Sequence, residues 1–288
     1  KDHVYSYDNL IYGQTKNLEV KKNKLYTFIN DKTSNISQYT NLLKVIDSIV
    51  ILSGLVGDPI TKKYPNLSIN INEKDIIKIM RLGKKFGVSK IIFVSTCSNY
   101  GIVKKNFLAN ERNKLKPLSI YAKSKVKCEK FLINLKCNCP TILRFATAFG
   151  WSSRMRFDLT VNEFTRNQFF KKKMYLYDQD TWRPYCHIKD FSRIIRKILK
   201  TDKKKISHQV FNVGSNKNNS TKRSLMRKIN KILKTNDNNI QYLSKGFDKR
   251  DYRVNFNKLE KKLDIKVKYS IDYGIKEIVK KLKENKKK

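Results

Sequence analysis

Short apolar runs alternate with longer amphipathic segments through the first half of the chain. The apolar runs that predict strands are residues 3–8, 25–29, 48–52, 90–95 and 141–145. The segments with apolar residues at about helical spacing lie between them, at 36–46, 70–86 and 121–135. The run from Ile91 to Val94 is continuous rather than alternating, which is typical of a parallel strand buried on both faces. Strands that alternate with helices in this way predict an α/β fold with a doubly wound parallel sheet.

The pattern changes after Gly150. Helical spacing predicts helices at 158–170, 188–199, 221–234, 255–263 and 271–283, and short apolar runs predict extended segments at 174–177 and 210–214. The helix at 188–199 is strongly amphipathic, and the polar residues 215–220 are expected to form a linker. This second part of the chain is expected to form a smaller α/β lobe that closes over a ligand at the carboxyl ends of the strands.

The chain carries a large positive charge, because 64 Lys and Arg against 24 Asp and Glu give a formal net charge of +40. Such a charge favours a polyanionic partner such as nucleic acid, a membrane surface or a phosphorylated substrate. The basic residues are spread over every predicted helix rather than gathered in one stripe, so we interpret the charge mainly as a bias of composition. A non-catalytic, basic nucleic-acid-binding protein stays open as an alternative function, although nucleic acid is not the expected partner.

The cysteines are odd in number and have neither the spacing of a disulfide framework nor that of a zinc site. They are Cys97, Cys128, Cys137, Cys139 and Cys186. We therefore expect reduced thiols, no metal site and a cytoplasmic location. No apolar run approaches the roughly 18 residues of a membrane-spanning helix, so no membrane association is expected.

A tyrosine and a lysine four residues apart, Tyr121 and Lys125, would share one face of a helix. An ammonium beside a phenol favours the phenolate and lowers the pKa of the tyrosine, which yields a general base near neutral pH. Thr96, at the end of the predicted strand 90–95, would hold the substrate hydroxyl. A chain rich in Tyr and Lys produces this spacing by chance, but its place after a strand that ends in Ser-Thr gives it weight.

Four motifs follow one another in a fixed order. They are Ser95-Thr96 before Tyr100-Gly101, Tyr121-x-x-x-Lys125, Arg144-x-Ala146-Thr147-x-Phe149-Gly150 and Trp182-Arg183-Pro184-Tyr185-x-His187-x-x-Asp190. In this order and spacing, nearly the whole chain resembles the extended short-chain dehydrogenase/reductases, and among them the NAD-dependent nucleotide-sugar epimerases and dehydratases. The resemblance implies a Rossmann-like NAD-binding domain at 1–150, with 186–214 packing back on it. It implies a substrate-binding lobe made of 151–185 and 215–288.

The resemblance implies roles for the catalytic and cofactor-binding residues. Tyr121 would take the proton of a sugar hydroxyl, Lys125 would hold the nicotinamide ribose, and Thr96 would orient the hydroxyl. The residues that would bind NAD are Asp8, Asn9, Asp31, Leu52, Ser53, Gly54, Tyr121 and Lys125. An acid at position 8 with no arginine directly after it favours NAD over NADP.

The residues that the resemblance places near a nucleotide-sugar substrate are Ser98, Arg154, Arg156, Asn162, Arg183 and Arg253. Arg183 would reach the nucleotide diphosphate, a task suited to a guanidinium fork. Family members that eliminate water carry Asp-Glu directly after the catalytic Thr, whereas this chain has Cys97-Ser98. We therefore expect a homodimeric nucleotide-sugar epimerase that transfers a hydride at the sugar C4, with a dehydratase or a 4-keto-sugar reductase as alternatives. His187 is expected to be a packed structural residue.

One part of the resemblance is missing. Such proteins begin with a strand and a glycine-rich turn whose backbone N–H groups meet the cofactor pyrophosphate. The ten glycines of this chain form no G-x-G-x-x-G or G-x-x-G-x-x-G. If Asp8 is the ribose-binding acid, which lies about 20 residues after that motif, the motif would precede residue 1. We therefore expect a chain truncated before its first β-α unit and inactive on its own.

Overall fold

The computed structural model describes residues 2–13, 23–104, 106–244, 246 and 248–286. The chain divides into two compact units, each built from several stretches of sequence. The first unit consists of Lys1–Ser95, Ser119–Ile142 and Ile206–Gln209. The second unit consists of Thr96–Leu118, Leu143–Lys205 and Val210–Lys288.

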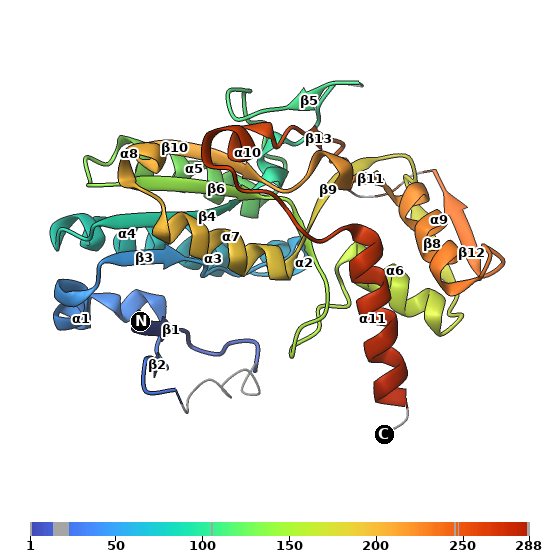
Figure 1. Cartoon of the computed structure of the whole chain (residues 1–288), viewed down its shortest axis with the longest axis horizontal. Coiled ribbons are helices and arrows are strands. Elements are labelled where there is room, and N and C mark those ends of the chain that lie inside the picture. Colours follow the sequence, from blue (N-terminus) through green and yellow to red (C-terminus); the bar gives the residue numbers. More distant parts are fainter. Residues whose placement is uncertain (1, 14–22, 105, 245, 247, 287–288) are drawn as a thin grey trace. The chain divides into compact units, whose positions relative to one another are not determined.

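Parallel strands form the framework of the first unit (Figure 1). Strand β1 (Val4–Tyr7) pairs with β2 (Tyr26–Ile29), and β3 (Ser48–Ile51) pairs with β4 (Lys90–Thr96), both in parallel. A four-stranded sheet has the order β10-β6-β4-β3, where β6 is Pro140–Phe145 and β10 is Gln209–Val213. Along the chain, β4, β6 and β10 begin in the first unit and end in the second. Among the described residues, β1 and β2 form a separate two-stranded sheet.

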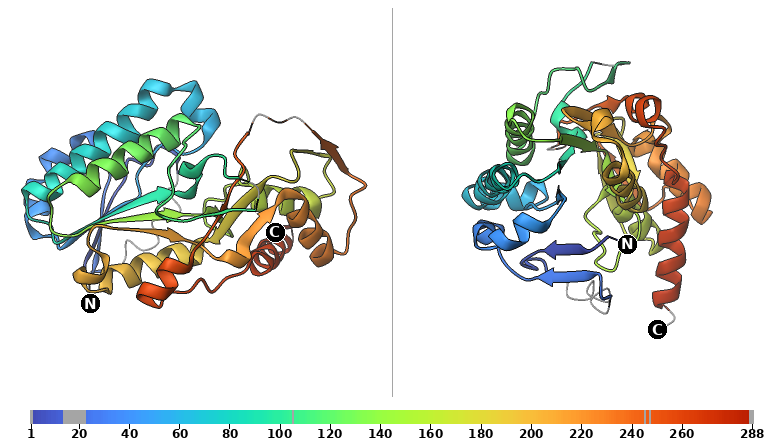
Figure 2. Two further views of the ribbon diagram at one scale, coloured as in Figure 1. Left: turned by 90° about the horizontal axis from the view of Figure 1, so that it is seen from above. Right: turned by 60° about the vertical axis from the view of Figure 1, so that its left-hand side comes forward.

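One long helical stretch packs against β3 and β4. It comprises α3 (Pro65–Ile69), a π-helical turn η3 (Asn70–Lys74) and α4 (Asp75–Lys85). Gly83 lets α4 approach the strands closely, because a Cβ at this position would lie 2.9 Å from Ile91 and 3.2 Å from Ile49. Helix α5 (Ile120–Asn134) runs beside this stretch (Figure 2). The shorter helices of the unit are η2 (Thr33–Gln38), α1 (Thr40–Val45) and α2 (Asp58–Lys63), and α8 (Lys203–Ile206) lies at the division between the units.

The second unit combines small sheets with a cluster of helices. Its strands are β5 (Leu108–Ala109), β7 (Thr147–Phe149), β8 (Met174–Tyr177), β9 (Trp182–His187), β11 (Asn219–Thr221), β12 (Ile240–Leu243) and β13 (Arg253–Val254). Its α-helices are α6 (Thr160–Phe169), α7 (Ile188–Lys200), α9 (Lys222–Leu233), α10 (Asn257–Leu263) and α11 (Ile271–Lys286). Strand β9 lies between antiparallel β11 and parallel β7, and β8 pairs in parallel with β12.

Helices α6, α9 and α11 pack on one another around the hydrophobic core of this unit (Figure 2). The core residues include Phe149, Val161, Met174, Leu176, Leu225, Met226, Ile271 and Ile275, all buried. The amphipathic face predicted for α7 is also buried at Ile194 and Ile198. Next to them, Phe191 stacks on Phe145 with ring centroids 3.9 Å apart.

Two expected elements differ in the structure. The helix expected at 36–46 is divided at Tyr39 into η2 and α1, and the Tyr39 hydroxyl donates a hydrogen bond to Asp31 at 2.9 Å. The linker expected at 215–220 is instead the short helix η5 (Asn216–Asn218) followed by β11. The reason is that the Asn219 side-chain amide acts like a strand neighbour: its Nδ2 donates to the Val254 carbonyl at 3.0 Å and its Oδ1 accepts from the Val254 N–H at 2.9 Å.

The cysteines carry free thiols, and all except the half-buried Cys137 are buried. Within the described ranges, no group of three or more His, Cys, Asp or Glu side chains has an arrangement suited to a metal ion. None of the helices described is both long and apolar enough to cross a bilayer.

Two glycines with similar positive φ, Gly101 and Gly87, differ in whether a neighbour lies close to them. Replacing each by alanine therefore separates the destabilising effect of backbone conformation from that of a steric contact. At Gly101 (φ 70°) a Cβ would lie 2.0 Å from the Lys116 carbonyl oxygen, whereas at Gly87 (φ 68°) nothing lies within 4 Å. We expect Gly87→Ala to lower the free energy of unfolding by about 1 kcal/mol through conformation alone. Gly101→Ala should lower it by at least about 2 kcal/mol more, because the backbone must move. Urea unfolding followed by circular dichroism measures both, and equal losses would show that the Lys116 contact is unimportant.

Candidate active site

The predicted cofactor-binding residues of the first unit follow the carboxyl ends of its parallel strands. Asp8 and Asn9 come directly after β1, Asp31 follows β2, and Leu52, Ser53 and Gly54 follow β3. In open α/β sheets, ligands bind outside this edge of the sheet.

A tyrosine joins the loop after β1 to the loop after β3. Asp8 accepts the Leu10 N–H at 2.7 Å, and Asn9 accepts the Ile11 N–H at 3.3 Å, so both side chains shape their own turn. The Tyr12 hydroxyl then accepts the Val56 N–H at 3.0 Å. The structure thus brings the loops of Asp8–Asn9 and of Leu52–Gly54 together.

Asp31 stabilises the turn after β2. Its carboxylate accepts hydrogen bonds from the Lys32 N–H at 2.6 Å, Asn35 at 2.8 Å and the Tyr39 hydroxyl at 2.9 Å. Burial acts to raise the pKa of Asp31, but these hydrogen bonds outweigh it and hold the pKa below its usual range. A contact with adenine stays a prediction for this residue.

Asn72, which the sequence analysis missed, holds the loop after β3. Its Oδ1 accepts the Leu55 N–H at 2.7 Å, and its Nδ2 donates to the Leu55 carbonyl at 3.0 Å and to Ser68 at 3.1 Å. A Cβ on Gly54 would lie 2.9 Å from the same Oδ1, so glycine is needed here for the asparagine to reach the loop. Asn72 is fully buried, but its neighbours Asn70, Glu73 and Lys74 are also polar, so the local pattern carries no sign of its burial.

Lys125 lies one turn beyond Tyr121 on α5, as the spacing predicted. The helix begins after Ser119, whose Oγ caps it by accepting the Ala122 N–H at 3.2 Å. The Lys125 Nζ donates to the Val94 carbonyl at 3.0 Å and lies 5.6 Å from the centroid of the Tyr121 ring. The side chain is 2% exposed, and burial lowers the pKa of Lys125 to about 8, although Cys128 and Glu129 act in the opposite direction.

A second hydrogen bond attaches α5 to β4. The Ser95 hydroxyl donates to the buried carboxylate of Glu129 at 2.5 Å, two turns beyond Tyr121. Sequence reasoning missed Glu129, because a glutamate in a helix gives no sign that it is buried. Together with the Lys125–Val94 bond, this contact fixes the position of Tyr121 relative to the end of β4.

Thr96 is the first residue of the second unit and caps the short helix η4 (Cys97–Tyr100). Its Oγ1 accepts the Ser98 N–H at 3.1 Å and lies 2.9 Å from the Ser98 hydroxyl. The Cys97 thiol is buried and donates to the Arg144 carbonyl at 3.1 Å. Ser98 is thus tied to Thr96, and Cys97 is a packing residue.

Arg183 shares a carboxylate with a second arginine. Its Nη1 donates to the Trp182 carbonyl at 2.7 Å, and its Nη2 lies 3.1 Å from Oδ2 of Asp248. Arg250 binds the same Asp248 through Nε at 2.7 Å and Nη2 at 2.8 Å. Burial acts to raise the pKa of Asp248, but the hydrogen bond from Arg250 and the charges of both arginines hold it well below its usual range. Two guanidinium groups on one carboxylate leave a net positive charge, which suits a phosphate.

Arg253 lines a cavity of about 700 Å³ within the second unit. Its guanidinium lies over the Trp182 ring, 5.0 Å from the centroid. Other residues of the cavity are Asn106, Phe107, Gln179, Asp251 and Tyr252. Arg183 packs against the same Tyr252 ring at 5.3 Å, so the two predicted substrate arginines lie near one another.

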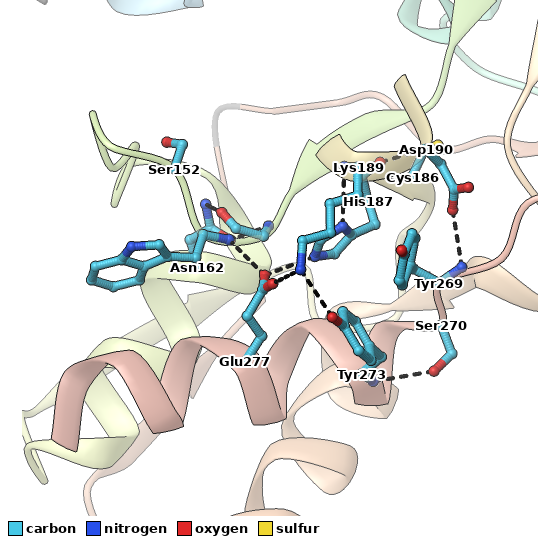
Figure 3. Close-up of polar contacts among 12 residues, drawn as sticks. Ser152, Asn162, Cys186, His187, Lys189, Asp190, Tyr269, Ser270, Tyr273 and Glu277 are labelled. Carbon is cyan, nitrogen blue, oxygen red and sulfur yellow. Dashed lines mark hydrogen bonds and ion pairs between the residues drawn. The ribbon is translucent and has the colours of Figure 1, made fainter. Parts of the chain in front are cut away.

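The remaining predicted substrate residues lie in or beside the loop 150–158, of which Figure 3 shows Asn162. Arg156 forms a bidentate ion pair with Asp158, with contacts of 2.7 and 2.5 Å. The carbonyl of Arg154 accepts the Ser152 hydroxyl at 2.6 Å. Asn162 is buried, and its amide binds the Gly150 N–H at 3.0 Å and the Arg156 carbonyl at 3.0 Å. Asn162 thus orders the loop that carries both arginines.

Comparison with known proteins identifies the family. Residues 2–214 match the NAD dependent epimerase/dehydratase family. The chain belongs to this family. A UDP-glucuronate 4-epimerase of Thermodesulfobacterium geofontis is 26% identical over 93% of the chain and 82% of that protein. An uncharacterized protein of Methanocaldococcus jannaschii is 27% identical over 99% of the chain and 87% of that protein.

Solved structures of the family share the fold. A UDP-glucuronic acid 4-epimerase from Bacillus cereus, in complex with UDP-glucuronic acid and NAD, has a TM-score of 0.85 at 22% identity and covers 98% of this chain and 91% of that chain. A dTDP-glucose 4,6-dehydratase from Bacillus anthracis, in complex with NAD, has a TM-score of 0.82 at 22% identity and covers 98% and 88%. The predicted family and the Rossmann-like α/β fold are therefore confirmed, and NAD is the cofactor of the family.

The burial of Lys125 predicts a pH-dependent stability. Below pH 8 the folded protein holds a buried ammonium, whereas above pH 8 the folded form loses this proton and the unfolded chain keeps it up to its ordinary pKa of 10.5. Stability at this site should therefore rise with pH between about 8 and 10.5. In Lys125→Met the penalty is absent, so its stability relative to the parent should fall by about 2 kcal/mol between pH 7 and pH 10. Urea unfolding of both proteins over this range tests the prediction, and parallel pH profiles would contradict it.

Proposed function

We propose that the protein is an NAD-dependent nucleotide-sugar epimerase that acts at the sugar C4 with Tyr121 as its base. The observation that carries the proposal is the arrangement on α5: Tyr121 at the start of the helix, with the buried Lys125 Nζ 5.6 Å from its ring centroid. Family membership and the resemblance to a UDP-glucuronate 4-epimerase support it.

Each member of the proposed catalytic set has a separate task. Tyr121 removes the proton from the C4 hydroxyl, and Thr96 orients that hydroxyl through its own side chain. Lys125 holds the nicotinamide ribose and supplies positive charge beside the tyrosine ring. Bound NAD would accept the hydride from C4 and return it to the opposite face of the sugar.

The residues after Thr96 favour epimerisation over dehydration. Elimination of water needs an acid and a base beside the sugar. The turn η4 carries no carboxylate, since its residues are Cys, Ser, Asn and Tyr. The Cys97 thiol is buried and donates to a carbonyl, and Ser98 is hydrogen-bonded to Thr96. Hydride transfer at C4 requires neither of the missing carboxylates.

The loops at the carboxyl ends of β1, β2 and β3 fit part of a dinucleotide. Asp8 and Asn9 would hold the adenosine ribose and Asp31 would lie by the adenine. Leu52, Ser53 and Gly54 would run along the cofactor as backbone, with their loop held by Asn72. The ten glycines of the chain form no glycine-rich turn of the kind that meets a pyrophosphate, so these residues leave the pyrophosphate without its usual binding site.

The second unit would bind the nucleotide sugar. Arg183 would bind the diphosphate. It shares the single negative charge of Asp248 with Arg250, so these three side chains together keep a net positive charge. Arg253 and the cavity of about 700 Å³ that it lines would take a further part of the ligand, with Ser98, Arg154, Arg156 and Asn162 at the substrate site. A homodimer is part of the proposal.

Removal of the proposed base tests the proposal. In protein expressed from the complete coding sequence, Tyr121→Phe should lower the rate of C4 epimerisation by about 10²–10⁴-fold. Tyr175→Phe is the matched control, because Tyr175 is half-exposed on β8 and should keep full activity. NMR analysis of products from a panel of nucleotide sugars provides the measurement. Normal turnover in Tyr121→Phe would end the assignment.

The fate of the cofactor separates an epimerase from a reductase. Because an epimerase returns the hydride, the purified protein should release NAD on denaturation and show no net consumption of NADH or NADPH during turnover. Absorbance at the nicotinamide band and quantification of released nucleotide measure both. Steady consumption of NAD(P)H in proportion to product would instead identify a 4-keto-sugar reductase.

A further inference from the structure

A buried histidine and a carboxylate lie under the start of the loop 150–158 (Figure 3). His187, at the end of β9, is fully buried, and its Nε2 lies 3.0 Å from Oε2 of Glu277 on α11. The same Oε2 accepts the Trp151 N–H at 3.1 Å, and Oε1 accepts the Lys189 Nζ at 2.5 Å. Glu277 therefore connects α11 to the end of β9, to the first turn of α7 and to the loop.

The hydrogen bonds around His187 define its tautomer. Its Nδ1 accepts the backbone N–H of Lys189 at 3.2 Å, so the proton of the neutral ring is on Nε2 and is donated to Glu277. Burial lowers the pKa of His187, which keeps the ring neutral near pH 7, although the charge of Glu277 acts in the opposite direction. For Glu277, burial acts to raise the pKa, but the hydrogen bonds from Lys189 and the Trp151 N–H lower it. The carboxylate is therefore ionised and acts as an acceptor for three donors.

Gly150 lies directly against the histidine of this pair. Its φ is +115°, and a Cβ at this position would lie 2.4 Å from Nε2 of His187. The loop thus begins directly on the imidazole, in a conformation and at a distance that a side chain would disturb.

The other side of the loop is also fixed. Asn162 binds the Gly150 N–H at 3.0 Å and the Arg156 carbonyl at 3.0 Å. Trp151 packs edge-to-face on Phe157 with ring centroids 6.4 Å apart. The segment that contains Arg154 and Arg156 is therefore held at its start by Glu277 and closed across by Asn162.

We propose that Glu277 is a positioning residue for nucleotide-sugar binding, which acts by holding the Trp151 N–H and hence the loop that carries Arg154 and Arg156. The inference rests on the proposed function, since it is that function which makes these arginines substrate ligands. Glu277 itself does not touch the substrate. The length of the Glu277 side chain, which brings its acceptor oxygen to the Trp151 N–H, matters more than its charge. The reason is that the Lys189 side chain is half-exposed, so its Nζ can bind water in place of the carboxylate.

Two substitutions separate reach from charge. Glu277→Gln keeps the length and an acceptor oxygen for Trp151 but removes the charge, whereas Glu277→Asp keeps the charge and withdraws the oxygen by one methylene. We expect Glu277→Asp to raise the KM for the nucleotide sugar by about 10-fold with kcat within about 2-fold, and Glu277→Gln to stay within about 3-fold of the parent KM. The control is Asp272→Asn on the same helix, which removes the exposed ion pair of Asp272 with Lys228 of α9 and should change neither constant.

Fluorescence of Trp151 reports on the loop without any substrate. Trp151 and Trp182 are the two tryptophans of the chain, so a Trp182→Phe background leaves Trp151 as the single tryptophan, which is excited selectively at the red edge of the absorption band. Acrylamide quenching of Trp151 should increase in Glu277→Asp and remain close to the parent value in Glu277→Gln and Asp272→Asn.

The outcomes distinguish this inference from the proposed function. Unchanged KM and unchanged quenching in folded Glu277→Asp would overturn the inference, as would a larger effect of Glu277→Gln than of Glu277→Asp. A parent protein that binds no nucleotide sugar would overturn the proposed function, and the inference with it as far as substrate is concerned. Quenching that increases only in Glu277→Asp would then still support the role of Glu277 in holding the loop.

Discussion

The attachment of α5 to β4 is the constraint on which the proposed catalytic site depends. Two buried ionisable side chains make it: Lys125 donates to the carbonyl of Val94, and Glu129 accepts from Ser95. An ionisable group is costly to bury, and each of these bonds gives one such group a hydrogen-bond partner in the strand. Loss of either bond would therefore leave a buried polar group unsatisfied. Tyr121 lies one turn before the first of these bonds. Its place beside the sheet is therefore set by residues farther along the helix.

Carboxylates perform much of the ordering in a chain with a net charge of +40. Asp190 is fully buried and accepts the N–H groups of Lys268 and Tyr269 as well as the guanidinium of Arg193. Asp248 and Glu277 likewise accept several donors each. Each of these three acids therefore gathers donors from different segments of the second unit.

The elements that depend on local pattern were predictable, and those that depend on distant partners were not. The continuous apolar run of β4 and the apolar face of α7 can be recognised from the few residues that form each element. Strand β9 mixes Arg, Pro and His, and it is a strand because β7 and β11 pair with its two edges. In the candidate site, the Tyr121–Lys125 spacing was visible in the sequence. The role of Glu277 was not, because its partner Trp151 lies 126 positions away.

The π-helical turn η3 has a consequence for how this segment tolerates changes in length. A π-turn is an α-helix with one residue inserted, and here it carries Asn72 between α3 and α4. Deleting one residue from it would restore a regular helix and leave α3 and α4 on nearly their present faces, because the widened turn takes up the extra residue within a single turn. The residue at stake is Asn72, whose amide holds both the N–H and the carbonyl of Leu55. A shortened segment would thus keep the helix face that Gly83 presents to the strands, but it would lose the turn that carries the side chain holding the loop after β3.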